Sequence, residues 1–396
     1  MASEWLECCL GDIASFKNGK GLKKDLYSPT GKNPVWGSNG QIARTNELLN
    51  EHPVIVIGRV GAYCGSVHAV TEPNWVTDNA ILSMPLTGND FRYLYYLMTS
   101  LQLERTAIGS AQPLLTQSGL KIISCRVAPE PEQKAIAHIL GTLDDKIELN
   151  RKMNETLEAM AQALFKSWFI DFDPVRRNAA RAQNQPSSPA LLPKGEGGKS
   201  PLPMGEDLGE GSVEAFDRLF PDSFQPSELG PIPEGWDVKP LSKMVELIGG
   251  GTPKKSEPKF WGGSIPWYSV KDAPAEGDVF VLDTTDKITQ EGLDGSSTKL
   301  LQEGVTIISA RGTVGKLALV GNTMAMNQSC YGVKGLGSIG PCLNYFNLKR
   351  SLGVLRRNTH GAVFDTITRS TFDTVSMVQP NDAPALFFEE QVNPLL

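Results

Sequence analysis

The sequence has no long apolar run and no recognisable leader. No stretch reaches the roughly 18 apolar residues that a transmembrane helix needs, and the start lacks the basic and apolar regions of a signal peptide. The 396 residues are 40% hydrophobic and 21% charged, which is typical of globular domains. The sequence therefore predicts a cytoplasmic protein of two or three domains without membrane contact.

Metal-binding patterns are also missing. No two cysteines form a C-x-x-C pair, and the four histidines do not cluster with them. We expect reduced, mostly packed thiols and no metal site. The six cysteines are Cys8, Cys9, Cys64, Cys125, Cys330 and Cys342.

Catalytic motifs are absent as well. The segment GTVGKL at 312–317 superficially resembles a phosphate-binding loop, but its spacing is short and Leu317 has no hydroxyl for a metal ion. No dinucleotide-binding glycine pattern, nucleophile–base pair or nuclease carboxylate set is found. The sequence predicts a non-catalytic protein, and a self-sufficient DNA enzyme is the disfavoured alternative.

What the chain does contain is an approximate internal duplication. Trp5, Leu10 and Lys23-Lys24 recur at one common spacing as Trp236, Leu241 and Lys254-Lys255. Further along, VIVI at 54–57 answers VTII at 305–308, Arg59 answers Arg311, and Glu132-Gln133 answers Glu390-Gln391. Because the spacing grows along the chain, we expect an insertion within residues 260–300. The pattern predicts two similar globular lobes of α/β (α+β) class, each followed by a helix.

A long helix with one apolar seam is predicted after the first lobe. Apolar residues alternate at spacings of four and three, as in a coiled coil, and Gly141 is the weak point, costing about 1 kcal/mol relative to alanine. Two asparagines fall in the seam, where they either fix the register with a partner helix or turn to solvent. The seam consists of Ile136, Leu140, Leu143, Ile147, Asn150, Asn154, Leu157, Ala161, Leu164 and Trp168.

Composition changes after this helix. The following segment is rich in Pro, Gly, Ser and Glu and has few large apolar residues, which predicts a flexible linker. The predicted organisation is a first domain at 1–130, a spacer helix at 131–177, a linker at 178–212, a second domain at 213–383 and the start of a distal helix at 384–396.

The net charge of −6 at first argues against nucleic acid. Most of the acidic excess lies in the connecting segment, however, and each lobe is close to neutral, so each lobe can still present a basic face. Lysines neutralise phosphates, while arginine and asparagine pair with base edges. The candidate DNA-binding residues are Lys20, Lys23, Lys24, Asn39, Arg59, Lys254, Lys255, Arg311, Arg356 and Arg357.

Several segments resemble one family. The motifs GTPK at 251–254, FWGGSIPW at 260–267, SARGTVG at 309–315 and NQS at 327–329 are similar to the target-recognition domain of type I restriction-modification specificity subunits. The segments AIAHIL at 135–140, LDDKI at 143–147 and LFKSWFIDF at 164–172 resemble the spacer helix of the same family. The resemblance covers nearly the whole chain outside the linker.

This resemblance implies a non-catalytic subunit that reads a bipartite target in double-stranded DNA. Two target-recognition domains would each read one half, and two antiparallel helices would set the gap between them. Two methyltransferase subunits would dock on this scaffold and modify adenine with S-adenosylmethionine. A motor-nuclease subunit that uses ATP and Mg²⁺ would complete the restriction enzyme.

One departure from the family pattern is noted. The distal helix should begin near residues 387–391 and run about as far as the first helix, whereas this sequence stops at Leu396. We therefore expect the seam to depend on partner subunits or on self-association. The alternative function is a shortened interaction or decoy protein that binds methyltransferase subunits without reading DNA.

Overall fold

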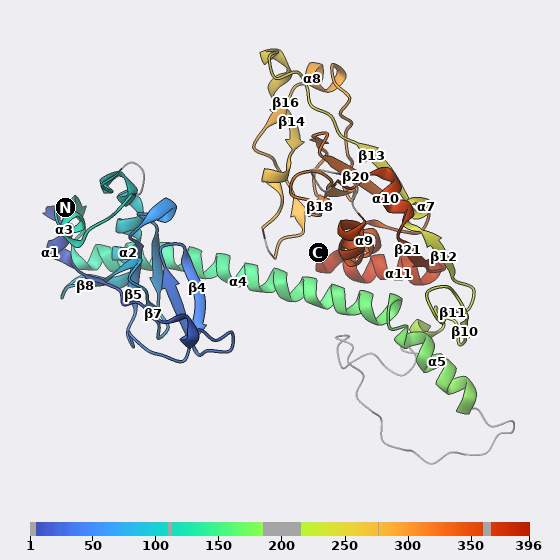
Figure 1. The fold of residues 1–396 in the computed structure, drawn as a ribbon, viewed down its shortest axis with the longest axis horizontal. Helices are drawn as coiled ribbons and strands as arrows, with labels where there is room; N and C mark the ends of the chain where they lie inside the picture. The colour runs from blue at the N-terminus through green and yellow to red at the C-terminus, as the bar shows by residue number, and fades with distance from the viewer. Residues whose placement is uncertain (1–4, 110–112, 185–214, 276, 359–365) are drawn as a thin grey trace. The chain divides into compact units, whose positions relative to one another are not determined.

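The computed structural model describes residues 5–109, 113–184, 215–275, 277–358 and 366–396. The chain divides into two compact units, Met1–Glu148 and Leu149–Leu396, and the division falls inside one continuous helix. Figure 1 labels the helices and strands of both units. None of the helices in these described ranges has the length and apolar character that a membrane span requires.

The first lobe comprises residues 5–127 of the first unit. Its elements are β1 (Leu6–Cys9), α1 (Leu10–Ile13), β2 (Ala14–Asn18), η1 (Lys24–Leu26), β3 (Asn33–Gly37), β4 (Gly40–Thr45), β5 (Val54–Gly58), η2 (Gly61–Tyr63), β6 (Val67–Val70), β7 (Trp75–Val76), β8 (Ala80–Pro85), α2 (Phe91–Ser100), η3 (Leu103–Thr106), α3 (Gln117–Lys121) and β9 (Ser124–Val127).

Two sheets and a helical layer form this lobe. One sheet has the order β2-β8-β5-β6, the other β4-β3-β7, and β1 pairs with β9. Strand β5 is buried on both faces, which explains its unbroken apolar sequence. Ile55 and Ile57 pack in the core that contains α2, while Val54 and Val56 pack in the core beneath Trp36. Successive side chains of a strand point to opposite faces, so this one strand joins both cores.

The predicted long helix is α4 (Glu130–Phe169). It ends one residue after the last seam position, and the predicted spacer segment 131–177 continues past Phe172, which has a φ of 57°, into a second helix, α5 (Asp173–Asn184). Gly141 also has a packing reason: a Cβ atom there would lie 2.3 Å from Nη1 of Arg92. The Arg92 guanidinium donates two 2.9 Å hydrogen bonds to Asp145, so the glycine lets α2 approach α4 closely.

The second unit continues from α4 and α5. Its elements are β10 (Phe224–Gln225), β11 (Ile232–Pro233), β12 (Asp237–Pro240), α7 (Leu241–Met244), β13 (Val245–Gly249), η4 (Pro258–Phe260), β14 (Trp261–Tyr268), η5 (Val270–Asp272), β15 (Phe280–Val281), β16 (Lys287–Ile288), α8 (Gln290–Asp294), β17 (Thr306–Ser309), β18 (Leu317–Val320), β19 (Ala325–Met326), β20 (Cys330–Gly335), α9 (Pro341–Arg357), α10 (Arg369–Asp373), β21 (Ser376–Gln379), α11 (Asp382–Val392) and η6 (Asn393–Leu395).

The second lobe, residues 237–379, confirms the predicted duplication. Its sheets have the orders β13-β20-β17-β18-β15 and β16-β14-β19, and β12 pairs with β21 as β1 pairs with β9. The middle strand again serves two cores, since Ile308 packs in the cluster with Phe346 and Ile307 in the cluster with Tyr268. The segment between β14 and β16 replaces the short β3–β4 turn, and this insertion lies within the predicted range.

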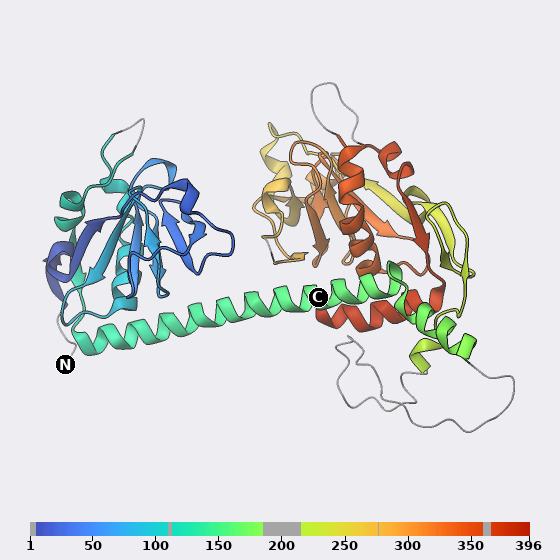
Figure 2. The same ribbon diagram turned by 60° about the horizontal axis from the view of Figure 1, so that its bottom comes forward.

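The C-terminal part of α4 is covered within the second unit. Helix α11 lies along it (Figure 2), and Phe388 contacts both Trp168 and Phe165 at ring-centroid distances of 5.7 and 6.1 Å. Phe387 stacks on Trp168 at 5.8 Å. Burying aromatic side chains contributes strongly to core stability, so this contact fixes the C-terminal part of α4 to α11.

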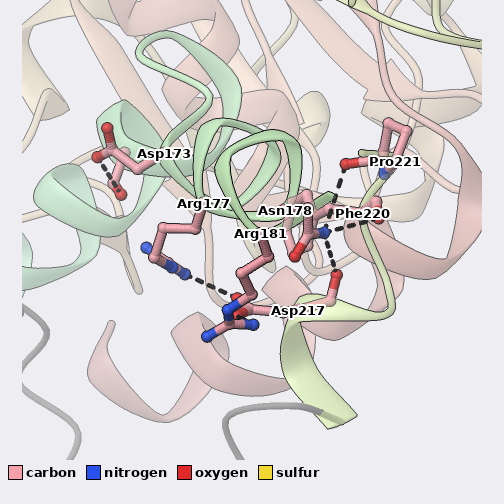
Figure 3. Close-up of polar contacts among 8 residues, drawn as sticks. Asp173, Arg177, Asn178, Arg181, Asp217, Phe220 and Pro221 are labelled. Carbon is pink, nitrogen blue, oxygen red and sulfur yellow. Dashed lines mark hydrogen bonds and ion pairs between the residues drawn. The ribbon is translucent and has the colours of Figure 1, made fainter. Parts of the chain in front are cut away.

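Helix α5 is fastened by a buried carboxylate (Figure 3). Asp217 is 2% exposed and accepts charge-assisted hydrogen bonds from Arg177 at 2.9 Å and Arg181 at 2.6 Å. The Asn178 amide donates to the carbonyls of Asp217 and Phe220 at 2.7 and 3.1 Å. Residues 178–184, which the sequence assigns to the linker, are therefore helical and ordered against the lobe. The rest of the predicted linker, 185–212, lies outside the described residues.

Candidate nucleic-acid interface

Several candidate residues of the first lobe meet at one edge. The N–H of Lys20 donates to the carbonyl of Val76 at 2.9 Å, at the end of β7 where the next turn begins. Arg59 makes two hydrogen bonds to the same turn. Its backbone N–H donates to the carbonyl of Asn79 at 3.0 Å, and its guanidinium Nη1 donates to the carbonyl of Asp78 at 3.1 Å. Three loops and this turn define the first edge: residues 19–20, 38–40, 58–60 and 77–79.

Asn39 belongs to the first edge, whereas Lys23 and Lys24 are placed beside it. Asn39 is exposed in the β3–β4 turn. Lys23 and Lys24 are exposed at η1, whose contacts are with the end of β4: the Thr45 hydroxyl donates to the carbonyl of Leu26 at 2.8 Å. The structure thus groups Lys20, Asn39 and Arg59 and puts the lysine pair next to the three-stranded sheet.

The second lobe has a corresponding edge at residues 250–252, 310–312 and 327–329. The N–H of Gly251 donates to Met326 at 3.0 Å, and the Thr252 hydroxyl bonds the side chain of Gln328. The N–H of Arg311 donates to the carbonyl of Ser329 at 3.2 Å, and its side chain is exposed.

Lys254 and Lys255 follow the second edge directly in sequence and are both exposed. The carbonyl of Lys254 accepts hydrogen bonds from the Trp261 indole at 3.2 Å and from the N–H of Glu257 at 3.1 Å. Backbone contacts therefore fix the position of this lysine and leave its ammonium group toward solvent.

Arg356 and Arg357 lie at the C-terminal end of α9. Arg356 donates through Nη2 to the carbonyl of Gly315 at 3.2 Å, in the turn that also carries Arg311. A Cβ atom at Gly315 would lie 2.5 Å from Nε of Arg356, so the two pack closely. Arg356 thereby supports the turn of Arg311, while Arg357 is exposed on the neighbouring face.

The pairing of Arg59 with Arg311 needs a correction of one residue. Leu115 donates its N–H to Arg59, and Ile367 donates its N–H to Ala310, so Ala310 occupies the place of Arg59. Gly61 and Gly312 correspond, with φ values of 77° and 75° that only glycine adopts readily. The two turns match, but their arginines project from neighbouring positions.

The predicted match of Glu132-Gln133 with Glu390-Gln391 is wrong. The first backbone hydrogen bonds of the two helices, Gln133 to Pro129 and Ala385 to Asn381, align Gln133 with Ala385. Gln133 accepts the N–H of Asp90 before α2, at 2.9 Å. In the second unit the equivalent acceptor is Glu389, one helical turn further along α11. Its carboxylate accepts the N–H groups of Cys342 and Leu343 at the start of α9.

The seam of α4 has two different halves. Leu164 and Trp168 are buried, Ile136 and Leu157 are half-buried, and Leu140, Leu143 and Ile147 are exposed. Asn150 and Asn154 are exposed on the same helix. The predicted seam is thus covered toward its C-terminal end and open between residues 139 and 154.

One histidine packs beside the β3–β4 turn of the first edge. Burial lowers the pKa of His68, whose ring lies 5.5 Å from that of Trp36, and so favours its neutral form. Among the residues that the structure describes, no group of three or more His, Cys, Asp and Glu side chains is arranged to hold a metal ion.

Sequence reasoning overlooked two polar side chains that hold loops together, one in each lobe. The Ser38 hydroxyl joins loops of the first edge. In the second lobe the Asp272 carboxylate accepts hydrogen bonds from the backbone and hydroxyl groups of both Ser269 and Thr285, at 2.7 to 2.9 Å. Burial alone would raise the pKa of Asp272, but these hydrogen bonds outweigh it and lower the pKa. Only the polar composition of the turns signalled these roles.

Comparison with known proteins identifies the family of this chain. The profile of the type I restriction modification DNA specificity domain matches residues 2–159 and 233–375, and the chain belongs to this family. The predicted resemblance and the two-lobed fold are confirmed.

Individual relatives agree with this assignment. The HindI specificity subunit of Haemophilus influenzae is 28% identical over 305 residues, which cover 71% of this chain and 64% of that protein. The MjaIX specificity subunit of Methanocaldococcus jannaschii is 27% identical over 160 residues, covering 40% of this chain and 37% of that protein. The chain thus matches less than two thirds of the length of either relative. Both are specificity subunits, in agreement with the prediction of a non-catalytic chain.

A solved structure shares the fold. The S subunit of a type I restriction-modification system from M. genitalium superposes with a TM-score of 0.56 and 14% sequence identity, over all of this chain and 91% of that chain.

Proposed function

We propose that this chain reads DNA as the specificity subunit of a type I restriction-modification complex, each edge contacting one half of a bipartite target. The observation that carries the proposal is the repetition of one edge in both lobes, each with an exposed or half-buried arginine beside a polar turn. Arginine and asparagine recognise base edges, and nearby lysines neutralise phosphates.

Partner subunits supply the chemistry in this proposal. Two methyltransferase subunits would bind S-adenosylmethionine and methylate adenine, and a motor-nuclease subunit would use ATP and Mg²⁺, all in the cytoplasm. The exposed apolar residues Leu140, Leu143 and Ile147 support a scaffolding role for α4, since an uncovered coiled-coil seam favours a partner helix.

The test is methylation mapping in a methylation-free host that expresses this chain with the methyltransferase subunit of the same operon. We expect one bipartite, adenine-methylated motif. The control replaces this chain with an established specificity subunit that activates the same methyltransferase. Methylation in the control alone would contradict DNA reading and favour a decoy that binds methyltransferase subunits.

A further inference from the structure

Three loops of the first edge converge on a single side chain, Ser38. Its hydroxyl donates to the carbonyl of Asn79 in the β7–β8 turn. The same oxygen accepts the backbone N–H groups of Arg59 and Val60 at 3.2 and 3.3 Å. The carbonyl of Ser38 also accepts the hydroxyl of Ser66 at 2.7 Å.

We propose that Ser38 is the positioning residue of the first edge, holding the loops of Asn39 and Arg59 in the geometry that reads one half of the target. This inference rests on the proposed function, because it assigns a role in DNA reading. Ser38 itself need not touch DNA.

The hydrogen-bonding capacity of Ser38 is fully used. A serine hydroxyl has one donor and two acceptor sites, and Asn79, Arg59 and Val60 occupy all three. Replacement by alanine leaves the Val60 N–H without this acceptor, whereas Arg59 keeps its backbone bond to Asn79 at 3.0 Å. The loop after β5 then loses the bonds that Arg59 and Val60 make to the β3–β4 turn and keeps only the bond from Ser66 to the Ser38 carbonyl, while the strands keep their ladders.

The consequence reaches the side chains that face outward. Asn39 follows Ser38 directly, and Arg59 is held at its backbone by Ser38 and at its guanidinium by Asp78. Base recognition depends on placing such groups to within a fraction of an ångström. Freeing these loops therefore reduces discrimination among bases more than it reduces general affinity for phosphates.

The turn of the second lobe that corresponds to the β3–β4 turn is held by a different side chain. This turn is extended by the insertion after β14, and Asp272 ties the two ends of this insertion together through Ser269 and Thr285. No part of that arrangement uses Ser38. A change at Ser38 is therefore expected to act on one half of the target alone.

The experiment uses the full chain with its methyltransferase subunit, the methylated motif being mapped first for the wild type. We then measure methylation rates on DNA carrying single-base changes in either half, for Ser38→Ala, Ser38→Thr and Ser15→Ala. Ser15 is the matched control, because its hydroxyl makes one hydrogen bond, to Met84, in the same lobe away from the edge.

We expect Ser38→Ala to lower discrimination in one half about tenfold, as loss of a half-buried hydroxyl that makes three hydrogen bonds predicts, and to leave the other half unchanged. Ser38→Thr, which keeps the hydroxyl, and Ser15→Ala should both retain wild-type discrimination. Unchanged discrimination in Ser38→Ala would overturn the inference. So would an equal loss in both halves together with a lower melting temperature. A wild type that methylates no motif contradicts the proposed function itself, so the two failures are distinct.

Discussion

The two lobes share their strand order, apart from the additional strand β15 in the second, but a different tryptophan ties the loop to the sheet in each. In the first lobe the indole of Trp75 on β7 donates to the carbonyl of Lys20 at 2.7 Å. In the second the indole of Trp267 on β14 donates to the carbonyl of Gly251 at 3.0 Å. Residues 20 and 251 are equivalent. The N–H of Lys20 donates to the carbonyl of Val76 at the end of β7, and the N–H of Gly251 donates to that of Met326 at the end of β19.

The exchange follows from the parallel register. Val35 lies opposite Trp75 in one lobe, and Trp267 lies opposite Ala325 in the other, so each pair has one large and one small member. Either of the two paired strands can therefore supply the indole. The fold thus preserves the contact and not the position of the residue, which is why matching the lobes by identical residues misplaces some pairs.

The largest predicted effect comes from removing either of these two tryptophans. Trp75 and Trp267 are 8% and 5% exposed. Trp75→Ala and Trp267→Ala should each destabilise their own unit by about 3–5 kcal/mol, through lost burial, the cavity left behind and a carbonyl without its donor. Urea unfolding followed by circular dichroism gives the free energy of unfolding.

The matched control is Trp5→Ala, whose indole also makes one hydrogen bond, to Glu132, but whose side chain is 36% exposed. Its effect should stay below about 1 kcal/mol. If only one of the two buried tryptophans lowered the free energy of unfolding by this amount when replaced, the proposed equivalence of Trp75 and Trp267 would fail.

The second prediction compares Asp272, whose carboxylate can be protonated, with Ser38, whose hydroxyl stays neutral. The folded-state pKa of Asp272 lies below its ordinary value of about 3.9, so its contribution is present above that value and is lost as pH falls through the folded pKa. The second unit should therefore lose stability below about pH 4 with a steeper slope than Asp272→Asn. Ser38 has no charge to lose in this range.

The measurement is the difference in unfolding free energy between wild type and Asp272→Asn from pH 7 down to pH 3. Taking the difference cancels the acids common to both proteins. The difference should shrink as the carboxyl becomes protonated. A difference that is constant over this range would show that the hydrogen bonds to Asp272 do not depend on its charge.

The sequence predicted the elements that depend on local pattern. The apolar spacing of α4 and the buried runs of β5 and β17 were found because periodicity is written in neighbouring residues. The offset of Arg59 against Arg311 was not, since strand register is set by hydrogen bonds between residues far apart in the chain. The roles of Ser38 and Asp272 were missed for the same reason.

The smallest predicted effect concerns one helical glycine in each unit. A Cβ atom at Gly353 in α9 would meet Nη1 of Arg357 at 3.7 Å, an ordinary contact, whereas at Gly141 it would meet Arg92 at 2.3 Å. Gly353→Ala should therefore gain the full helix propensity of alanine, about 1 kcal/mol. Gly141→Ala gains the same propensity but displaces Arg92 from Asp145, so its net gain should be smaller.

A double-mutant cycle distinguishes this contact from propensity alone. In an Arg92→Ala background the obstructing guanidinium is gone, and Gly141→Ala should then stabilise the first unit as much as Gly353→Ala stabilises the second. The Arg92–Asp145 pair is exposed, with side chains 45% and 64% accessible, so salt should weaken the coupling. Equal gains for Gly141→Ala with and without Arg92 would mean that the side chain moves aside freely. The close approach of α2 to α4 would then not need the glycine.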